Sequence, residues 1–174
     1  MSPARKKSAA EESPRSSVDR GLDTYRKKRD FEKTNEPASS REQGPEGRRV
    51  YAIQEHHASR LHYDLRLEDG GVLKSWAVPK TPPEKDGVRR LAVQTEDHPL
   101  GYETFEGVIP EGEYGAGRVK IWDSGTYELL ENDPGKKVLR IDGRRLRGRF
   151  ALIKLKPKNG DDDSWLFFKL KDKG

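Results

Sequence analysis

The sequence contains no cysteine among its 174 residues, which excludes disulfide bonds and any zinc site with thiolate ligands. This absence is compatible with a reducing cytoplasm. No apolar run approaches the ~20 residues of a membrane-spanning helix, and no apolar stretch follows the basic N-terminus as in a secretory signal. We therefore expect a cytoplasmic protein without a membrane segment.

Hydrophobic residues are also scarce, at 31% of the chain against 37% charged residues. Such a composition supports one compact core, but not a large one. The formal net charge is +5 and the isoelectric point is near 9.3. This mild excess permits nucleic-acid binding without proving it, and the 30 acidic residues mean that any functional positive charge must be local.

The chain shows no internal repeat and no long stretch with a helical period. Its first residues are mainly Ser, Ala, Pro, Lys and Glu, with almost nothing to bury. A second segment carries Leu22, Tyr25 and Phe31, which could dock a short arm or helical turn on the main body. We predict a disordered tail over 1–20, an arm and linker over 21–47, and the main domain over 48–172.

The main domain alternates short apolar runs with turn residues. We predict strands over 49–56, 61–68, 72–78, 89–96, 117–123, 126–131, 137–141, 147–155 and 164–171. Turn signals separate most of them, at Asp69-Gly70-Gly71, Ser124-Gly125, Asp133-Pro134-Gly135 and Lys158-Asn159-Gly160. Eight or nine short strands in about 125 residues predict an all-β fold, either an antiparallel barrel or a sandwich.

The run from 61 to 67 alternates without a break between apolar and polar residues, and its polar face is unusual. An ordinary surface strand would present a mixture of Thr, Lys, Ser and Glu to water. This strand instead aligns an imidazole, a carboxylate and a guanidinium, with neighbours about 6.5–7 Å apart. The two faces are Leu61, Tyr63, Leu65 and Leu67 on one side, and His62, Asp64 and Arg66 on the other.

The preceding strand follows the same parity, with Gln54 and His56 opposite its apolar face. The four-residue link 57–60 favours a hairpin that would bring His56 beside His62. In the strand over 89–96, Glu96 takes the polar face, and His98 and Tyr102 follow it. Three histidines, an aspartate and two Gln or Glu side chains are therefore expected on one polar side.

This combination predicts a metal ion next to a bound anion. Two neutral imidazoles and a carboxylate suit Mn, Fe or Zn, and they leave positions open for water or substrate. Arg66 could grip an anionic oxygen through its planar fork, while His98 and Tyr102 add donors. The set indicates phosphoryl chemistry. From the residues alone, His57 and His56 could exchange roles, although the position of His57 favours a surface or supporting residue.

Three other features have simpler interpretations. The glycine-rich stretch from Gly112 to Gly117 has the spacing of neither phosphate-binding motif, GxxxxGK[ST] or GxGxxG. It predicts a tight turn. The basic run 144–149 is interpreted as a solvated strand edge rather than a nucleic-acid track. The three tryptophans lie inside strand patterns and are predicted to be core residues: Trp76, Trp122 and Trp165.

Several segments resemble the phosphoesterase domain of bacterial ligase D, an enzyme of non-homologous end joining. They are QEHHASRLHYDLRLE, LKSWAVPK, AVQTEDHPLGYETFEGVIPEGEYGAG and IWDSGTYE. The resemblance extends over about residues 22–171. Because the polymerase and ligase domains of that enzyme cannot fit in this length, we expect a stand-alone version or an excised domain.

The resemblance implies a small β-barrel that carries a manganese-dependent 3′-end-healing activity. Such an enzyme removes a 3′-terminal ribonucleoside from a DNA primer strand and then removes the remaining 3′-phosphate to leave a 3′-OH. The resemblance also implies roles for the matching residues. The metal ligands would be His56, His62 and Asp64, the phosphate-contacting residues Arg66, His98 and Tyr102, and the supporting residues Gln54, Glu96, Arg29, Asp30 and Glu36.

The expected substrates are primer–template 3′ ends that carry a terminal ribonucleotide or phosphate, handled by a monomeric, nucleoid-associated protein. A polymerase, ligase or Ku-like protein is the expected partner. Which residue protonates the leaving group stays open, with His98 as a candidate. Two other functions also fit parts of the pattern. One is a non-haem iron oxygenase that uses His62, Asp64 and His98, and the other is a non-catalytic module that binds DNA ends.

Overall fold

The computed structural model describes residues 21–39, 49–157 and 163–171. The predicted tail over 1–20 and the predicted turn at Lys158-Asn159-Gly160 lie outside these residues. The described part holds one short α-helix, one 3₁₀ helix and nine strands. In chain order they are α3 (Asp23–Lys27), β1 (Arg49–His57), β2 (Leu61–Asp69), β3 (Val72–Val78), β4 (Arg89–Pro99), η1 (Tyr102–Thr104), β5 (Gly107–Ile109), β6 (Gly117–Asp133), β7 (Lys136–Gly143), β8 (Arg147–Lys154) and β9 (Ser164–Lys169).

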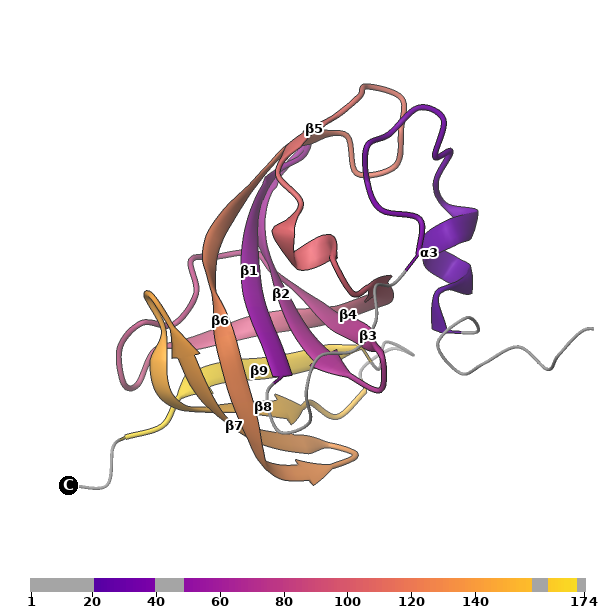
Figure 1. Cartoon of the computed structure of the whole chain (residues 1–174). Helices are drawn as coiled ribbons and strands as arrows, with labels where there is room; N and C mark the ends of the chain where they lie inside the picture. The colour runs from indigo at the N-terminus through magenta and orange to yellow at the C-terminus, as the bar shows by residue number, and fades with distance from the viewer. Residues whose placement is uncertain (1–20, 40–48, 158–162, 172–174) are drawn as a thin grey trace, which may run out of the picture.

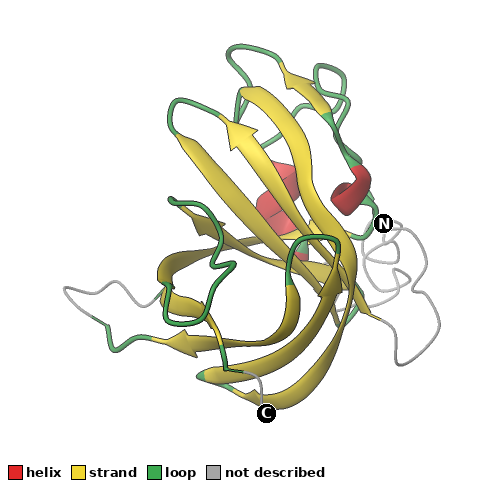
Figure 2. Ribbon diagram, turned by 90° about the vertical axis from the view of Figure 1, so that its left-hand side faces the viewer, coloured by secondary structure: helices red, strands yellow, loops and turns green. Residues whose placement is uncertain are grey.

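Eight of the strands close into an antiparallel barrel, which confirms the predicted fold class. The strands follow one another around the barrel in the order β1-β2-β3-β4-β9-β8-β7-β6, and β6 pairs back onto β1 to complete the ring. β5 adds to β6 outside this ring. Figure 1 shows β6 running through the height of the molecule, with α3 and η1 on the same side of the barrel. Figure 2 shows these two helical segments near one another in a view turned by 90°.

The barrel interior is filled by one face of each strand. Because strand side chains alternate between faces, every second residue of β1 and β2 points into this core. Burial of these apolar side chains removes them from water and supplies the main stabilisation of the barrel. The central members of the cluster are Tyr51, Ile53, Leu65, Leu67, Trp76, Leu139, Ile141, Phe150, Leu152, Trp165 and Phe167.

The opposite face of β1–β4 is also covered, so the barrel wall is buried on both sides. The arm that contains α3, the 3₁₀ helix η1 and the segment leading to β6 pack against this outer face. Their apolar side chains form a second cluster, made of Tyr25, Leu73, Leu100, Tyr102, Phe105, Ile109 and Val119. The polar face predicted for the strand over 61–67 is therefore covered by these segments and does not face open solvent.

The structure corrects one prediction about strand boundaries. The sequence pattern indicated two strands over 117–123 and 126–131 with a turn at Ser124-Gly125, but β6 is one continuous strand. Gly125 pairs with Tyr51 of β1 and Gly143 of β7. A Cβ atom there would lie 2.1 Å from the main-chain oxygen of Asp142, so glycine is required by a close approach of two strands and not by a turn.

Two smaller differences concern strands around the site. β5 was not predicted, because three residues are too few to show an alternating pattern. β4 continues to Pro99, past the predicted end at residue 96, and thus carries His98 within the strand. Within the described residues, no helix is both long and apolar enough to cross a membrane.

Asp123 of β6 gives a direct test of what holds the barrel together. Its buried carboxylate accepts a hydrogen bond from the Tyr51 hydroxyl at 2.9 Å and three more from the main-chain N–H groups of residues 144–146 at 2.8–2.9 Å. Asp123→Ala leaves these donors without an acceptor, and each unsatisfied buried donor costs about 1–3 kcal/mol. We expect the free energy of unfolding, measured by urea denaturation, to fall by about 3–5 kcal/mol.

The matched control is Asp142→Ala, which removes an exposed carboxylate from the outer face of the neighbouring strand β7. We expect it to change the free energy of unfolding by less than about 0.5 kcal/mol. Equal small losses in the two variants would contradict the assigned role of Asp123.

Candidate active site

A cavity of about 340 Å³ lies between the outer face of β1–β4 and the segments that cover it. Its walls carry most of the chemically reactive side chains that the sequence singled out. Those from the strands are His56, His62, Asp64, Arg66 and His98, and the arm adds Arg29.

Three of these residues bring potential metal-ligand atoms together. β1 and β2 pair with His56 opposite His62, so the predicted hairpin places the two imidazoles side by side. Nδ1 of His56 lies 3.5 Å from Oδ2 of Asp64, and Nε2 of His62 lies 3.2 Å from Oδ1. One ligand atom of each residue lies within 4.8 Å of the other two. The geometry therefore offers two nitrogens and one oxygen to a single ion.

The other nitrogen of each imidazole contacts a main-chain carbonyl. Nε2 of His56 donates to the oxygen of Gly115 at 2.6 Å, and Nδ1 of His62 donates to the oxygen of Arg60 at 3.2 Å. Because a carbonyl only accepts hydrogen bonds, these contacts place the proton of each neutral ring on the nitrogen away from Asp64. The nitrogens that face Asp64 then carry lone pairs, as ligand nitrogens do.

Lone pairs that converge on a carboxylate call for a positive charge between them, which a metal ion or, in its absence, a proton on His62 supplies. Burial alone would raise the pKa of Asp64, but the charge of Arg66 and the two close imidazoles hold it well below its usual range. Burial would lower the pKa of His62, but the adjacent Asp64 carboxylate outweighs this effect and raises it. Asp64 is thus ionised and attracts a cation, which fits the donor set to a divalent metal ion.

Arg66 lies immediately beside this group, with its side chain only 4% exposed. Its Nη2 lies 3.5 Å from Oδ2 of Asp64, and its Nε donates to Oε1 of Gln54 at 3.0 Å. The amide of Gln54 in turn donates to the main-chain oxygens of Tyr102 and Phe105. Gln54 therefore fixes the orientation of the guanidinium and ties it to the η1 segment.

His98 lies at the cationic end of the cavity. Its Nδ1 is 3.3 Å from Nη1 of Arg66 and its Nε2 is 3.5 Å from Nη2 of Arg29. Burial lowers the pKa of His98 well below its ordinary value, and the two guanidinium charges lower it further. His98 is therefore neutral near pH 7 and a poor proton donor to a leaving group, which argues against it as the general acid.

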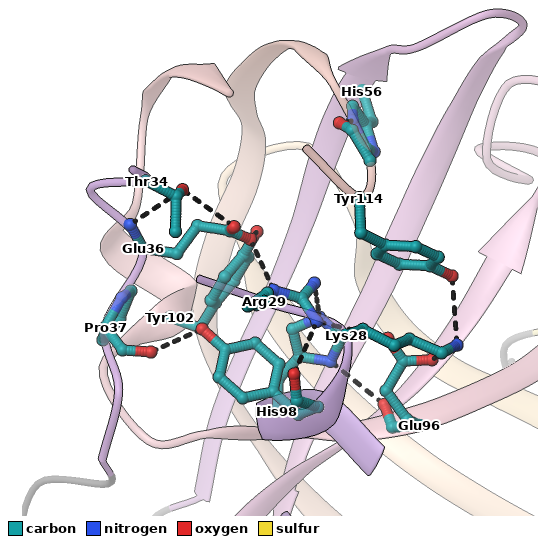
Figure 3. A network of polar contacts seen from close by, with 12 residues as sticks. Lys28, Arg29, Thr34, Glu36, Pro37, His56, Glu96, His98, Tyr102 and Tyr114 are labelled. Carbon is teal, nitrogen blue, oxygen red and sulfur yellow. Dashed lines mark hydrogen bonds and ion pairs between the residues drawn. The ribbon is translucent and has the colours of Figure 1, made fainter. Parts of the chain in front are cut away.

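Figure 3 shows how the arm completes this end of the cavity. Arg29 donates through Nε to Oε2 of Glu36 at 3.0 Å, and the Tyr102 hydroxyl donates to the same oxygen at 2.5 Å. Burial raises the pKa of Tyr102 well above its ordinary value, so the hydroxyl keeps its proton. Since that proton is directed at Glu36, the ring of Tyr102 is what packs against Arg66, whose Cζ lies 4.9 Å from the ring centroid.

Glu96 of β4 fastens the arm to the barrel. Its two carboxylate oxygens lie 3.1 Å from Nζ of Lys28 and 3.6 Å from Nη1 of Arg29. Lys28 also donates to the hydroxyl of Tyr114 at 3.2 Å, so the arm contacts the loop between β5 and β6 as well (Figure 3). The arm thus closes one side of the cavity.

One predicted site residue stays outside this arrangement. Asp30 is exposed, accepts a hydrogen bond from the main-chain N–H of Glu32 and pairs with Lys33 at 3.9 Å. It stabilises a turn of the arm and does not line the cavity. The remaining candidates from the sequence either line the cavity or contact a residue that does.

The sequence pattern missed several residues of the site. Lys28 belongs to a basic run that was not assigned a role, and the Thr34 hydroxyl donates to Oε1 of Glu36 at 2.9 Å without any sequence signal. Gly115 acts through its main-chain oxygen. The stretch around it forms a turn, as predicted, but the turn also orients His56.

His57 and the tryptophans agree with their sequence interpretations. His57 is exposed and contacts Glu55 at 2.5 Å, away from the ligand group. Trp76 and Trp165 are core residues, and Trp122 is partly buried against the same cluster. No second group of three metal-ligating side chains occurs among the described residues, so the triad of His62, Asp64 and His98 required by the oxygenase alternative does not form.

A larger hollow, of about 480 Å³, lies on the outer face of β6–β8. Arg140 and Arg147 stand there beside Glu128 and Asp142. Its charges are of both signs, and no histidine lines it. It therefore lacks the combination of ligand atoms and convergent cations that marks the smaller cavity.

Comparison with known proteins identifies a matching family. The family model for the DNA ligase D 3′-phosphoesterase domain matches residues 54–154. The multifunctional non-homologous end joining DNA repair protein LigD of Mycobacterium tuberculosis is 52% identical over 155 residues, which are 87% of this chain and 20% of that protein.

Two further relatives are multifunctional non-homologous end joining proteins named LigD. The protein from Mycolicibacterium smegmatis is 48% identical over 162 residues, covering 87% of this chain and 21% of the relative. The protein from Pseudomonas aeruginosa is 46% identical over 157 residues, covering 87% and 19%. The chain thus spans about a fifth of the length of these relatives.

Proposed function

Because the chain belongs to the DNA ligase D 3′-phosphoesterase domain family, we propose that it is a metal-dependent phosphoesterase that repairs 3′ ends of DNA. The observation that carries this proposal is a group of three ligand-bearing side chains beside two buried guanidinium groups in one cavity. A cation and convergent guanidinium donors suit a phosphoester, because negative charge develops on its oxygens in the transition state.

We propose Mn²⁺ as the ion, held by His56, His62 and Asp64. Two imidazoles and one carboxylate suit Mn²⁺ and leave positions for water and substrate, although other divalent transition metals match the same donors. When bound, the ion would act as a Lewis acid on a phosphate oxygen and would lower the pKa of a water molecule.

The protein groups around the ion would bind and orient the phosphate. Arg66 can donate two N–H groups to phosphate oxygens, and its position next to Asp64 would hold the phosphate beside the metal ligands. Arg29 would approach from the arm, held in place by Glu36 and Glu96. His98, which is neutral, would contribute a hydrogen bond without adding charge.

Two reactions follow from one site. In the first, a water oxygen bonds to phosphorus, the bond from phosphorus to the 5′ oxygen of the terminal ribonucleoside breaks, and that oxygen takes up a proton. The primer is left with a 3′-phosphate. In the second, water attacks this phosphate, the bond to the 3′ oxygen breaks, and the products are inorganic phosphate and a 3′-OH. The 2′-OH of the terminal ribose would be engaged in the first reaction.

The biological setting is proposed from the relatives, whose names describe non-homologous end joining and, for one of them, DNA repair. The chain would prepare 3′ ends so that a polymerase can extend them or a ligase can seal them, in the cytoplasm and close to the chromosome. A polymerase, a ligase or a Ku-like end-binding protein would be the natural partner.

An end-healing assay tests the proposal. A primer–template with one 3′-terminal ribonucleotide, and a matched primer–template with a 3′-phosphate, are incubated with the chain in Mn²⁺ or in chelator. We expect both primers to be converted to 3′-OH ends in Mn²⁺ and neither to change in chelator, because the chelator removes the ion that the ligand group holds. Unchanged ends in both conditions, together with a gel shift, would instead support a module that only binds DNA ends.

A further inference from the structure

Tyr114 is an aromatic residue that lines the cavity. It belongs neither to the metal-ligand group nor to the residues proposed to bind the phosphate. We infer that its ring stacks on the base of the 3′-terminal nucleoside and so makes Tyr114 a specificity-determining residue for removal of that nucleoside. The inference rests on the proposed function, because it presumes a phosphoester in the cavity.

The backbone of Tyr114 is anchored to the metal-ligand group. It lies in the loop between β5 and β6, next to Gly115, whose main-chain oxygen accepts the hydrogen bond from His56. Gly115 has φ +77°, a backbone conformation that residues other than glycine rarely adopt, so glycine permits this turn beside His56. Tyr114 is therefore held at a fixed place beside the ligands, as Figure 3 shows.

The side chain of Tyr114 is oriented but not covered. Its hydroxyl accepts a hydrogen bond from Lys28, whose Nζ lies 4.5 Å from the ring centroid, and Cζ of Arg29 lies 5.3 Å from it. The residue is nevertheless 47% exposed. Tyr25 and Tyr102, the other tyrosines of the site, are buried. Tyr114 thus offers a ring surface to a ligand, beside cations that attract a nucleic-acid backbone.

The size and closure of the cavity indicate which nucleoside would reach the ring. A volume of about 340 Å³ admits a single nucleotide but not a base pair. The contact between Lys28 and Tyr114 joins the arm to the loop, so Tyr114 borders the cavity on the side of the arm. The terminal nucleoside would therefore leave its template partner and enter the cavity alone, as bases do when enzymes act on them outside the duplex.

This placement separates the two proposed reactions. Removal of the terminal ribonucleoside would use the stacked base, whereas a primer that ends in a 3′-phosphate has no nucleoside beyond the phosphate. Stacking of one base on an aromatic ring is worth about 1–3 kcal/mol, which corresponds to roughly 5–150-fold in kcat/KM. The ratio of the two activities is therefore the informative quantity.

The experiment compares the unaltered chain with Tyr114→Leu and Tyr114→Phe. For each, kcat/KM is measured with three primer–templates that end in a ribonucleotide, in a ribose that lacks its base, or in a 3′-phosphate. For Tyr114→Leu we expect the ratio of ribonucleotide to 3′-phosphate activity to fall by about 5–150-fold. Tyr114→Phe keeps the ring and loses only the hydrogen bond between its hydroxyl and Lys28, so we expect its ratio to stay within about two-fold of the unaltered chain.

The primer that lacks the terminal base distinguishes stacking from a structural role. If Tyr114 acts through the base, the leucine variant and the unaltered chain process this primer equally well. An equal loss by Tyr114→Leu on all three primers, or no loss on any, would overturn the inference. Failure of the unaltered chain itself to convert the ribonucleotide and 3′-phosphate primers would overturn the proposed function.

Discussion

His62→Ala is expected to abolish conversion of both 3′-ribonucleotide and 3′-phosphate ends. The substitution removes one of the three ligand atoms and leaves His56 and Asp64 with an open side. Even outer-shell partners of metal ligands are worth about 10–100-fold in metal affinity, so loss of a ligand should weaken Mn²⁺ binding by at least ~100-fold. Isothermal titration with Mn²⁺, alongside the end-healing assay, measures both effects.

His57→Ala is the matched control for this experiment. His57 lies on the same hairpin, is exposed, and contacts Glu55 instead of the ligand group. Its removal should leave Mn²⁺ affinity and both activities within about two-fold of the unaltered chain, as expected for a surface change. Normal turnover by His62→Ala with metal still bound would refute the assignment of the ligands.

Arg66→Ala is expected to separate metal binding from catalysis. Mn²⁺ affinity should be retained, because the three ligand atoms remain and the competing charge next to Asp64 is gone. The rate should fall by about 10²–10³-fold in kcat on both kinds of end, as when one donor to a developing oxyanion is removed. Single-turnover kinetics at saturating Mn²⁺ isolates the chemical step from metal loading.

Two further variants sharpen the test of Arg66. Arg66→Lys keeps the charge but loses the planar fork that contacts Gln54 and Asp64 together, so it should recover little of the rate. Arg140→Ala removes an exposed arginine from β7, which lies three strands from β2 around the closed barrel and outside the site cavity, and should leave kcat unchanged. Full activity of Arg66→Ala would mean that Arg66 serves only the fold.

Alternation along the strands explains why the barrel and the ligand group could be predicted. Side-chain parity is a local property of a strand, so the faces of the run over 61–67 follow from its sequence alone. The short link likewise limits how β1 and β2 can pair, and they pair with His56 opposite His62. The link is one residue shorter than the predicted 57–60, because β1 continues to His57. These features needed no knowledge of distant contacts.

The way in which the arm and η1 cover the site could not be predicted from strand alternation. The hydrogen bond from Tyr102 to Glu36 joins residues 66 positions apart, and nothing in either segment indicates the other. Glu36 and Asp30 are both acids of the arm, yet only Glu36 turns inward, because the arm path directs Asp30 into a local turn. Which polar residue of an arm becomes buried depends on how the arm docks.

Glycine signals were ambiguous for a physical reason. A glycine can allow a turn or a close approach between strands, and the sequence does not distinguish the two. Gly125 was interpreted as a turn residue but lies where β6 crosses close to β7. Gly115 does lie in a turn, although its contribution to the site is a carbonyl oxygen, which every residue type possesses.

Because both faces of the barrel wall are covered, the protein is sensitive to any one-residue shift in the register of β2. In the middle of β2, Tyr63, Leu65 and Leu67 fill the interior, whereas His62, Asp64 and Arg66 line the cavity beneath the arm. Inserting one amino acid just before Tyr63 would reverse the two faces, turning leucines toward the cavity and an aspartate and an arginine toward the hydrophobic core. Such a shift would disrupt the hydrophobic core and the site together. The number of residues in this hairpin is therefore as constrained as their identity.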